Sequence, residues 1–183
     1  MPKPDFSVRR AAAGVDTQFV QRWSPRDYLP DAVDAQHLKA IFDAARWSPS
    51  CYNDQPWRFV TCTAQSHAKF LSCLVEANQA WAANAPVLGF AIARLHFSHN
   101  GKPNAHAVFD TGAAWMAVNL QAHQFGYHAH GMAGVDFGAA EKLLEIDTQR
   151  EKVICSFTIG LVNPQGNEPI TERNALESVW QQR

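Results

Sequence analysis

Two short, continuously apolar segments constrain the fold of this chain more than any other feature. Residues 86–93 read PVLGFAIA, and residues 153–162 read VICSFTIGLV. Such short apolar runs, without the alternation of a half-exposed strand, are typical of strands covered on both faces. Helices are the usual cover. The sequence therefore predicts an α+β domain in which helices pack on a small sheet.

The clearest helix is expected at residues 35–47. Asp34 precedes it, and its carboxylate can accept hydrogen bonds from the free amides of the first turn. Pro49 is expected to stop the helix. Four apolar residues recur at helical spacing and would bury one face: Leu38, Ile41, Phe42 and Ala45.

A second, longer helix is expected at residues 105–125. It is rich in small residues, which would let another helix approach closely, and Gly126 can end it because glycine adopts positive φ without a steric cost. The remaining predicted elements are a strand at 57–63, short helices at 66–75, 78–84, 136–146 and 175–180, a surface loop at 96–104 and a turn at 163–167.

Length and charge narrow the function classes. The 183 residues suit one domain, with residues 1–18 as a loosely held arm. A net charge of -1 argues against nucleic-acid binding. The sequence has no apolar run of membrane-spanning length and no apolar signal core at its N-terminus. The four cysteines show no CxxC spacing, so we expect a cytoplasmic protein without disulfides or a membrane partner.

A basic, hydroxyl-bearing cluster precedes the first helix. Arg22, Ser24 and Arg26 lie at alternate positions. Arginine grips phosphate oxygens with a planar fork, and a serine hydroxyl can donate one more hydrogen bond. Taken alone, the cluster could also be a solvated loop. Together with the polar turn after the helix, it favours a phosphorylated, planar ligand.

These residues resemble the nitroreductase family of flavin mononucleotide (FMN) enzymes. That family reads roughly R-x-S-x-R, a helix ending in A-A, and then P-S-S-x-N-x-Q-P-W. The corresponding residues here are 22–26 (RWSPR), 44–45 (AA) and 49–57 (PSCYNDQPW). Cys51 stands in place of the second serine.

The resemblance implies a fold and an activity for the whole chain, residues 1–183. The fold would be a small, mostly antiparallel central sheet flanked by helices, in an intertwined homodimer with two FMN sites at the interface. The activity would be ping-pong transfer of hydride from NADH or NADPH, through flavin N5, to an oxidised acceptor such as a nitroaromatic or a quinone. Such catalysis depends on positioning and electrostatics, so no catalytic side chain is predicted.

The resemblance also implies roles for individual residues. Arg22, Ser24 and Arg173 would bind the phosphate end, and Arg26 the pyrimidine edge. The backbone N–H groups of Ala133 and Gly134 would face N5. The turn after the first helix would reach the flavin of the partner subunit. The complete predicted cofactor set is Arg22, Trp23, Ser24, Arg26, Pro49, Ser50, Cys51, Asn53, Gln55, Asn78, Met132, Ala133, Gly134 and Arg173.

Alternatives remain at this point. The chain could be another FMN reductase on the same scaffold, acting on enoates or as a dehalogenase. It could also bind flavin without being an enzyme, because Trp81, Val135 and Thr171 depart from the family pattern. The eight histidines lack the cysteine or carboxylate spacing of a zinc site, so no metal is predicted.

Overall fold

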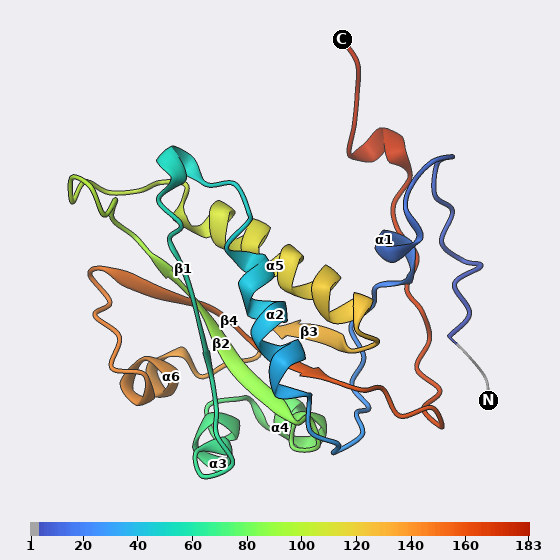
Figure 1. Cartoon of the computed structure of the whole chain (residues 1–183), viewed down its shortest axis with the longest axis horizontal. Coiled ribbons are helices and arrows are strands. Elements are labelled where there is room, and N and C mark those ends of the chain that lie inside the picture. The colour runs from blue at the N-terminus through green and yellow to red at the C-terminus, as the bar shows by residue number, and fades with distance from the viewer. Residues whose placement is uncertain (1–3) are drawn as a thin grey trace.

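The computed structural model describes residues 4–183 and has a four-stranded antiparallel sheet at its centre (Figure 1). The order of the strands is β1-β2-β4-β3, and every neighbouring pair is antiparallel. The strands are β1 (Trp57–Thr61), β2 (Val87–Arg94), β3 (His128–Met132) and β4 (Glu151–Gly160). The two apolar segments of the sequence are thus the two central strands, as predicted.

Helices cover both faces of this sheet. On one face, α2 (Ala35–Ala45) and α5 (Ala107–Gln124) pack through a buried cluster that includes Ile41, Val118 and Phe157. On the other face lie three shorter helices, α3 (His67–Leu71), α4 (Glu76–Ala82) and α6 (Phe137–Leu143). Seven of the eight residues of β2 are buried. Its side chains point alternately to the two faces of the sheet, so they contribute to both buried clusters.

Three residues that were predicted to mark helix ends do so in the structure. The Asp34 carboxylate accepts from the N–H groups of Gln36 at 2.8 Å and His37 at 2.9 Å, and α2 begins there. Gly126, with φ +80°, follows the end of α5. The carboxylate of Asp136 accepts from Ala139 N–H at 3.0 Å and caps α6.

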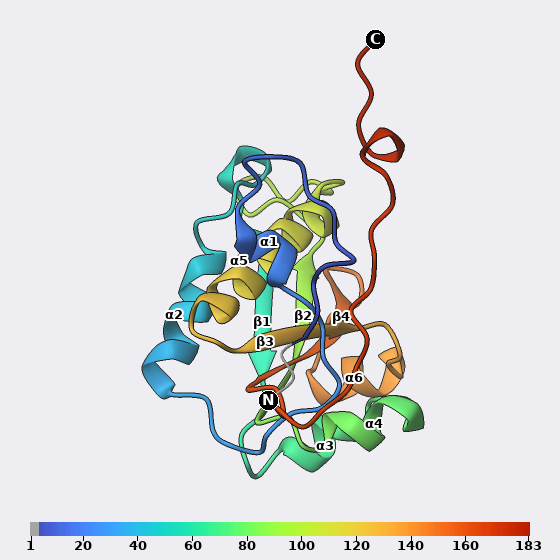
Figure 2. The ribbon, with the colours of Figure 1, turned by 90° about the vertical axis from the view of Figure 1, so that its right-hand side faces the viewer.

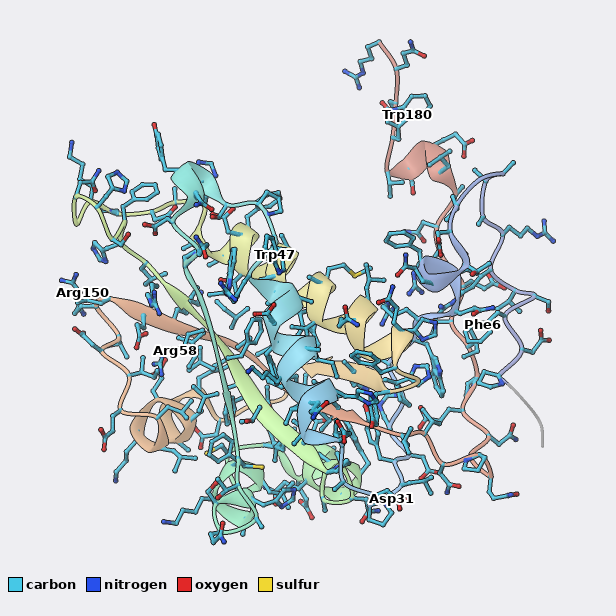
Figure 3. The ribbon with its side chains drawn as sticks, in the orientation of Figure 1. Phe6, Asp31, Trp47, Arg58, Arg150 and Trp180 are labelled. Atoms are coloured by element: carbon cyan, nitrogen blue, oxygen red, sulfur yellow. The ribbon has the colours of Figure 1, made fainter. Side chains whose placement is uncertain are left out.

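Three predicted helices are too long. The helix expected at 66–75 ends at Leu71, because residues 73–75 instead pair with the segment around Gly134 through backbone hydrogen bonds. The helix expected to reach residue 146 ends at Leu143, just before Glu145 adopts φ +53°. At 175–180 there is only the 3₁₀ turn η2 (Leu176–Ser178), because no buried partner supports a helix; Trp180 projects from the body (Figure 3).

Two elements were not predicted, and both lie near the N-terminal segment. The edge strand β3 has the sequence HAHGM, which lacks the β-branched residues that indicate a strand. The short helix α1 (Thr17–Gln21) is capped by Asp16, whose carboxylate accepts from Gln18 N–H. No helix in the described residues is long and apolar enough to cross a membrane.

In the described part of the N-terminal arm, residues 4–18, the side chain of Arg9 contacts the body of the protein. The Arg9 guanidinium donates to the carbonyl oxygens of Val20 (2.6 Å), Arg22 (2.7 Å) and Thr171 (3.0 Å). The N-terminal and C-terminal segments therefore run side by side (Figure 2).

Candidate functional site

Four arginines converge on a small cavity between the N-terminal and C-terminal segments. Its volume is about 180 Å³. Burial lowers the pKa of Arg22, and the like charge of Arg173 lowers it further. The pKa of Arg9 is lowered in the same way, by burial and then by the charges of Arg173 and Arg22. Among the described residues, none of the four arginines forms a salt bridge. The lining residues are Arg9, Arg22, Trp23, Ser24, Arg26, His130, Glu168, Pro169, Thr171 and Arg173.

The backbone of residues 22–26 explains how this cavity is formed. The segment is extended, with Trp23 and Pro25 buried, while Arg22, Ser24 and Arg26 alternate with them on the other side. Arg22 Nη1 lies 3.3 Å from Ser24 Oγ. A cluster of cations of this kind is suited to an anion with several oxygen atoms, such as a phosphate.

Sequence reasoning missed several cavity residues, among them Arg9, His130 and Glu168. Arg9 lies in the arm that was expected to be loose, and His130 lies on the unpredicted strand β3. His130 Nδ1 lies 2.8 Å from the carbonyl oxygen of Pro25, and its ring lies 4.8 Å from that of Trp81. In the sequence, the alternation His128-Ala129-His130 was the available signal for a strand. In the structure, Ala129 is buried and the two histidines face away from the core.

His128 supplies a pH-dependent contribution to stability. Burial, together with the neighbouring charges of His123 and Arg22, lowers its pKa to about 4. The unfolded chain takes up this proton near pH 6.5. Stability should therefore be highest above about pH 6.5 and fall as pH decreases toward 4, by up to about 1.4 kcal/mol per pH unit from this group.

We expect His128→Gln to reduce this acid sensitivity, because glutamine stays neutral in both states. Urea denaturation between pH 4.5 and pH 7 measures the effect. His106→Gln, which alters an exposed histidine, is the control. A His128→Gln variant that loses stability on acidification as steeply as the parent protein would contradict the assignment.

A second part of the predicted site lies where α4 meets the segment after β3. Asn78 Nδ2 donates to the carbonyl oxygen of Gly134 at 3.1 Å. A Cβ atom on Gly134 would lie 2.5 Å from that nitrogen, so any larger residue would displace the Asn78 amide. Among the described residues, the N–H groups of Ala133 and Gly134 donate no hydrogen bond. The buried side chain of Met132 points into the core, which leaves only its backbone for a ligand.

The stacking of Trp81 on His130 connects these two parts. Trp81 lies on α4 one turn after Asn78, while His130 lies on β3 two residues before Met132 and also lines the arginine cavity. The structure thus brings together most of the predicted cofactor residues: Arg22, Trp23, Ser24, Arg26, Arg173, Asn78, Met132, Ala133 and Gly134.

The third part is the turn between α2 and β1, which contains the 3₁₀ turn η1 (Cys51–Asn53). Three residues of this turn have φ between +50° and +55°: Tyr52, Asn53 and Gln55. Residues other than glycine rarely adopt this backbone region. Two hydrogen bonds from backbone N–H groups to side chains help to hold the turn. Cys51 N–H donates to the buried Asp110 carboxylate at 3.0 Å, and Gln55 N–H donates to Ser50 Oγ at 3.0 Å. Pro49 precedes the turn on the surface.

This turn lies far from the arginine cavity of the same chain. It contacts Asp110 in the first turn of α5, whereas the cavity lies near the other end of α5, where the rings of His123 and His128 are 5.3 Å apart (Figure 1). At 1.5 Å per residue, Asp110 and His123 are separated by about 20 Å along the helix axis. One chain therefore does not bring all the predicted cofactor residues together.

The described residues contain no group of three or more His, Cys, Asp or Glu side chains that could hold a metal ion. The fold is that of an α+β protein, and the arginine cavity beside the sheet carries the cationic donors that a phosphorylated ligand needs. The residues present at the first two parts fit a flavin nucleotide: cationic donors for a phosphate, and a glycine corner with free N–H groups for a ring.

Comparison with known proteins assigns the chain more narrowly. The family model described as the nitroreductase family matches residues 19–79 and 64–161, which together are more than half of the chain. The chain therefore belongs to the nitroreductase family. The predicted recognition and the α+β fold with a small antiparallel sheet are confirmed.

Individual relatives agree with this assignment. A solved structure described as an oxidoreductase containing FMN is 39% identical, with a TM-score of 0.88, over 94% of this chain and 93% of that one. A Streptomyces coelicolor protein provisionally named as an NADH dehydrogenase/NAD(P)H nitroreductase is 24% identical over 91% of this chain and 94% of its own length. The nitrobenzene nitroreductase of Ectopseudomonas oleovorans is 32% identical over a segment of 66 residues. This segment is 36% of this chain and only 29% of that relative.

Proposed function

We propose that this protein is an FMN-dependent oxidoreductase that transfers reducing equivalents from NADH or NADPH to an oxidised organic acceptor. The acceptor would be a nitroaromatic or a quinone. For a quinone, the nicotinamide gives up a hydride and solvent gives a proton, and the two together convert the quinone into a hydroquinone. The observation that carries this proposal is the convergence of four arginines, none in a salt bridge with another described residue, beside the Asn78–Gly134 corner.

The residues of this chain would hold FMN by its two ends. Arg22, Ser24 and Arg173 would bind the phosphate, and the structure adds Arg9 to this set. Arg26 and the free oxygen of the Asn78 amide would meet the pyrimidine edge. When bound, FMN would accept and release hydride at N5. The free N–H groups of Ala133 and Gly134 would face that atom without adding a competing side chain.

We also propose that the protein acts as a homodimer. An antiparallel pairing of α5 with its copy across a twofold axis would place the Cys51 end of one subunit beside the arginine cavity of the other. The outer face of α5 suits such a pairing, because Phe109 is 78% exposed and Met116 37% exposed. Trp47, at the end of the neighbouring α2, is 79% exposed. Ser50, Cys51, Asn53 and Gln55 would then contact the flavin of the partner.

Gly112 gives a direct test of this dimer. It is exposed on α5, and a Cβ atom added to it meets nothing within 4 Å in its own chain. A Gly112→Glu variant should therefore fold, but it should separate into monomers and retain less FMN because a charge would enter the apolar interface. Sedimentation velocity and bound-flavin absorbance measure both effects. Gly138→Glu, at an exposed position on α6, is the control. A parent protein that is monomeric, or a Gly112→Glu variant that remains a dimer, would contradict the pairing.

All four cysteines are free thiols, which supports the proposed cytoplasmic setting.

The function itself is tested by stripping the protein of bound ligand and titrating it with FMN and with riboflavin, which lacks the phosphate. FMN should bind much more tightly. Anaerobic addition of NADH or NADPH should then bleach the flavin absorbance, and a quinone should restore it. Equal binding of FMN and riboflavin, or flavin that neither nicotinamide reduces, would contradict the proposal.

A further inference from the structure

Three aromatic rings from two separate loops form a compact, exposed cluster, which we call the ring cluster. Its members are Tyr52, from the turn after α2, and Phe97 and His99, from the loop after β2. The ring centroids are 5.7 Å apart for Tyr52–Phe97, 5.8 Å for Tyr52–His99 and 5.3 Å for Phe97–His99. Tyr52 is 81% exposed. The ring cluster belongs to neither hydrophobic core.

The two loops that carry these rings are fixed to each other. The Asp54 carboxylate accepts from both Ser98 N–H (2.8 Å) and Ser98 Oγ (2.7 Å). The loop after β2 is itself a tight hairpin. Phe97 N–H donates to the Lys102 carbonyl oxygen, the Phe97 carbonyl oxygen accepts from Gly101 N–H, and His96 forms a bridge with Pro103. The ring cluster is therefore held in place before any ligand arrives.

The backbone conformation of Tyr52 is strained, and little burial of its ring compensates for the strain. Its φ of +53° is unfavourable for a bulky residue, and its ring gains little burial. Strained residues that persist in a structure are concentrated at ligand sites, and exposed aromatic patches mark binding surfaces. The ring cluster thus has the features of a binding surface for another flat, apolar molecule.

The position of Tyr52 identifies the site to which this surface belongs. Tyr52 lies between Cys51 and Asn53, the residues proposed to contact the partner's flavin. We propose that the ring cluster is a wall of the acceptor pocket above that flavin, and that it selects planar ring acceptors by stacking. This inference rests on the proposed function and its homodimer. It assigns the specificity for ring acceptors to Tyr52, supported by Phe97 and His99.

Stacking predicts a dependence on the shape of the acceptor. Menadione, a planar quinone, should lose the contact with the ring when Tyr52 is removed. Ferricyanide has no ring to stack and serves as the reference acceptor. Tyr52→Gly removes the ring and is compatible with the positive φ of the turn, so the fold should be kept. Tyr52→Phe keeps the ring and removes only the hydroxyl.

The experiment uses the FMN-loaded full chain, reduced without oxygen by one equivalent of dithionite and mixed with each acceptor in a stopped-flow instrument. The menadione rate constant should fall at least about tenfold in Tyr52→Gly and stay within about twofold of the parent in Tyr52→Phe. The ferricyanide rate should be unchanged in both. As a second readout, calorimetry with redox-inert naphthalene-2-carboxylate should show weaker binding to Tyr52→Gly than to the parent or to Tyr52→Phe.

The outcomes separate the inference from the proposed function. A Tyr52→Gly protein that reacts with menadione at the parental rate and binds naphthalene-2-carboxylate equally well would overturn the ring-cluster inference alone. Equal losses with menadione and ferricyanide would also overturn it, because they would show a general effect on the flavin. A parent protein that takes up no FMN would overturn the proposed function, and the inference with it.

Discussion

Replacing Arg22 by alanine is expected to weaken FMN retention about ten- to 150-fold. Arg22 lies in the arginine cavity next to Ser24, with Arg173 close enough to lower its pKa. A hydrogen bond to a charged group contributes about 1.5–3 kcal/mol, and the phosphate would lose such a bond. Equilibrium dialysis, or fluorescence titration of the ligand-free protein with FMN, gives the dissociation constants.

The control is Arg10→Ala, which removes a neighbouring arginine that does not line this cavity. Its FMN affinity should match that of the parent protein. Riboflavin affinity should differ little between Arg22→Ala and the parent, because riboflavin has no phosphate. Unchanged FMN affinity in Arg22→Ala would show that the phosphate is bound elsewhere.

The largest expected effect on stability comes from Gly89→Ala. Gly89 lies in the middle of β2, and a Cβ atom there would lie 2.6 Å from Phe157 Cζ and 2.6 Å from the carbonyl oxygen of Val60. The ring could shift, but the oxygen belongs to the backbone of β1, the neighbouring strand. We expect a loss of about 2–3 kcal/mol in the free energy of unfolding, as for an overpacked core.

Gly138→Ala is the matched control for this substitution. Gly138 is exposed on α6, and its nearest neighbour to an added Cβ atom is Asp136 Oδ1 at 3.6 Å, an ordinary contact. Alanine should stabilise that helix by about 0.5–1 kcal/mol. Guanidinium denaturation of both variants tests the pair. A Gly89→Ala protein as stable as the parent would mean that β1 and β2 adjust to each other more freely than their packing indicates.

The central fold could be predicted because its signals are local. Continuous apolar runs gave the strands β2 and β4, and Asp34 and Asp136 marked two helix starts through hydrogen bonds to residues two or three positions away. The edge strand β3 could not be recognised in this way. It pairs only with β4, and its sequence contains two histidines and a glycine, which have no strong preference for a strand.

The candidate site was predictable in its residue types but not in its connections. The motif identified Arg22, Ser24 and Arg26 and, by spacing, Asn78. The hydrogen bond from Asn78 to Gly134 joins residues 56 positions apart, and the contact of Arg9 with Thr171 joins residues 162 positions apart. Such contacts depend on the path of the whole chain. The positive φ values of Tyr52, Asn53 and Gln55 likewise have no local signal, because none of these residues is glycine.

The three hydrogen bonds of Arg9 have a practical consequence for handling the protein. They connect the N-terminal segment to the backbone of Arg22 and to the C-terminal segment that carries Arg173. A protease that trims the chain past residue 9, or an affinity tag that pulls this segment away, would loosen two phosphate-facing arginines at once. Preparations that differ only in how their ends were processed would then differ in colour, because they would carry different amounts of flavin.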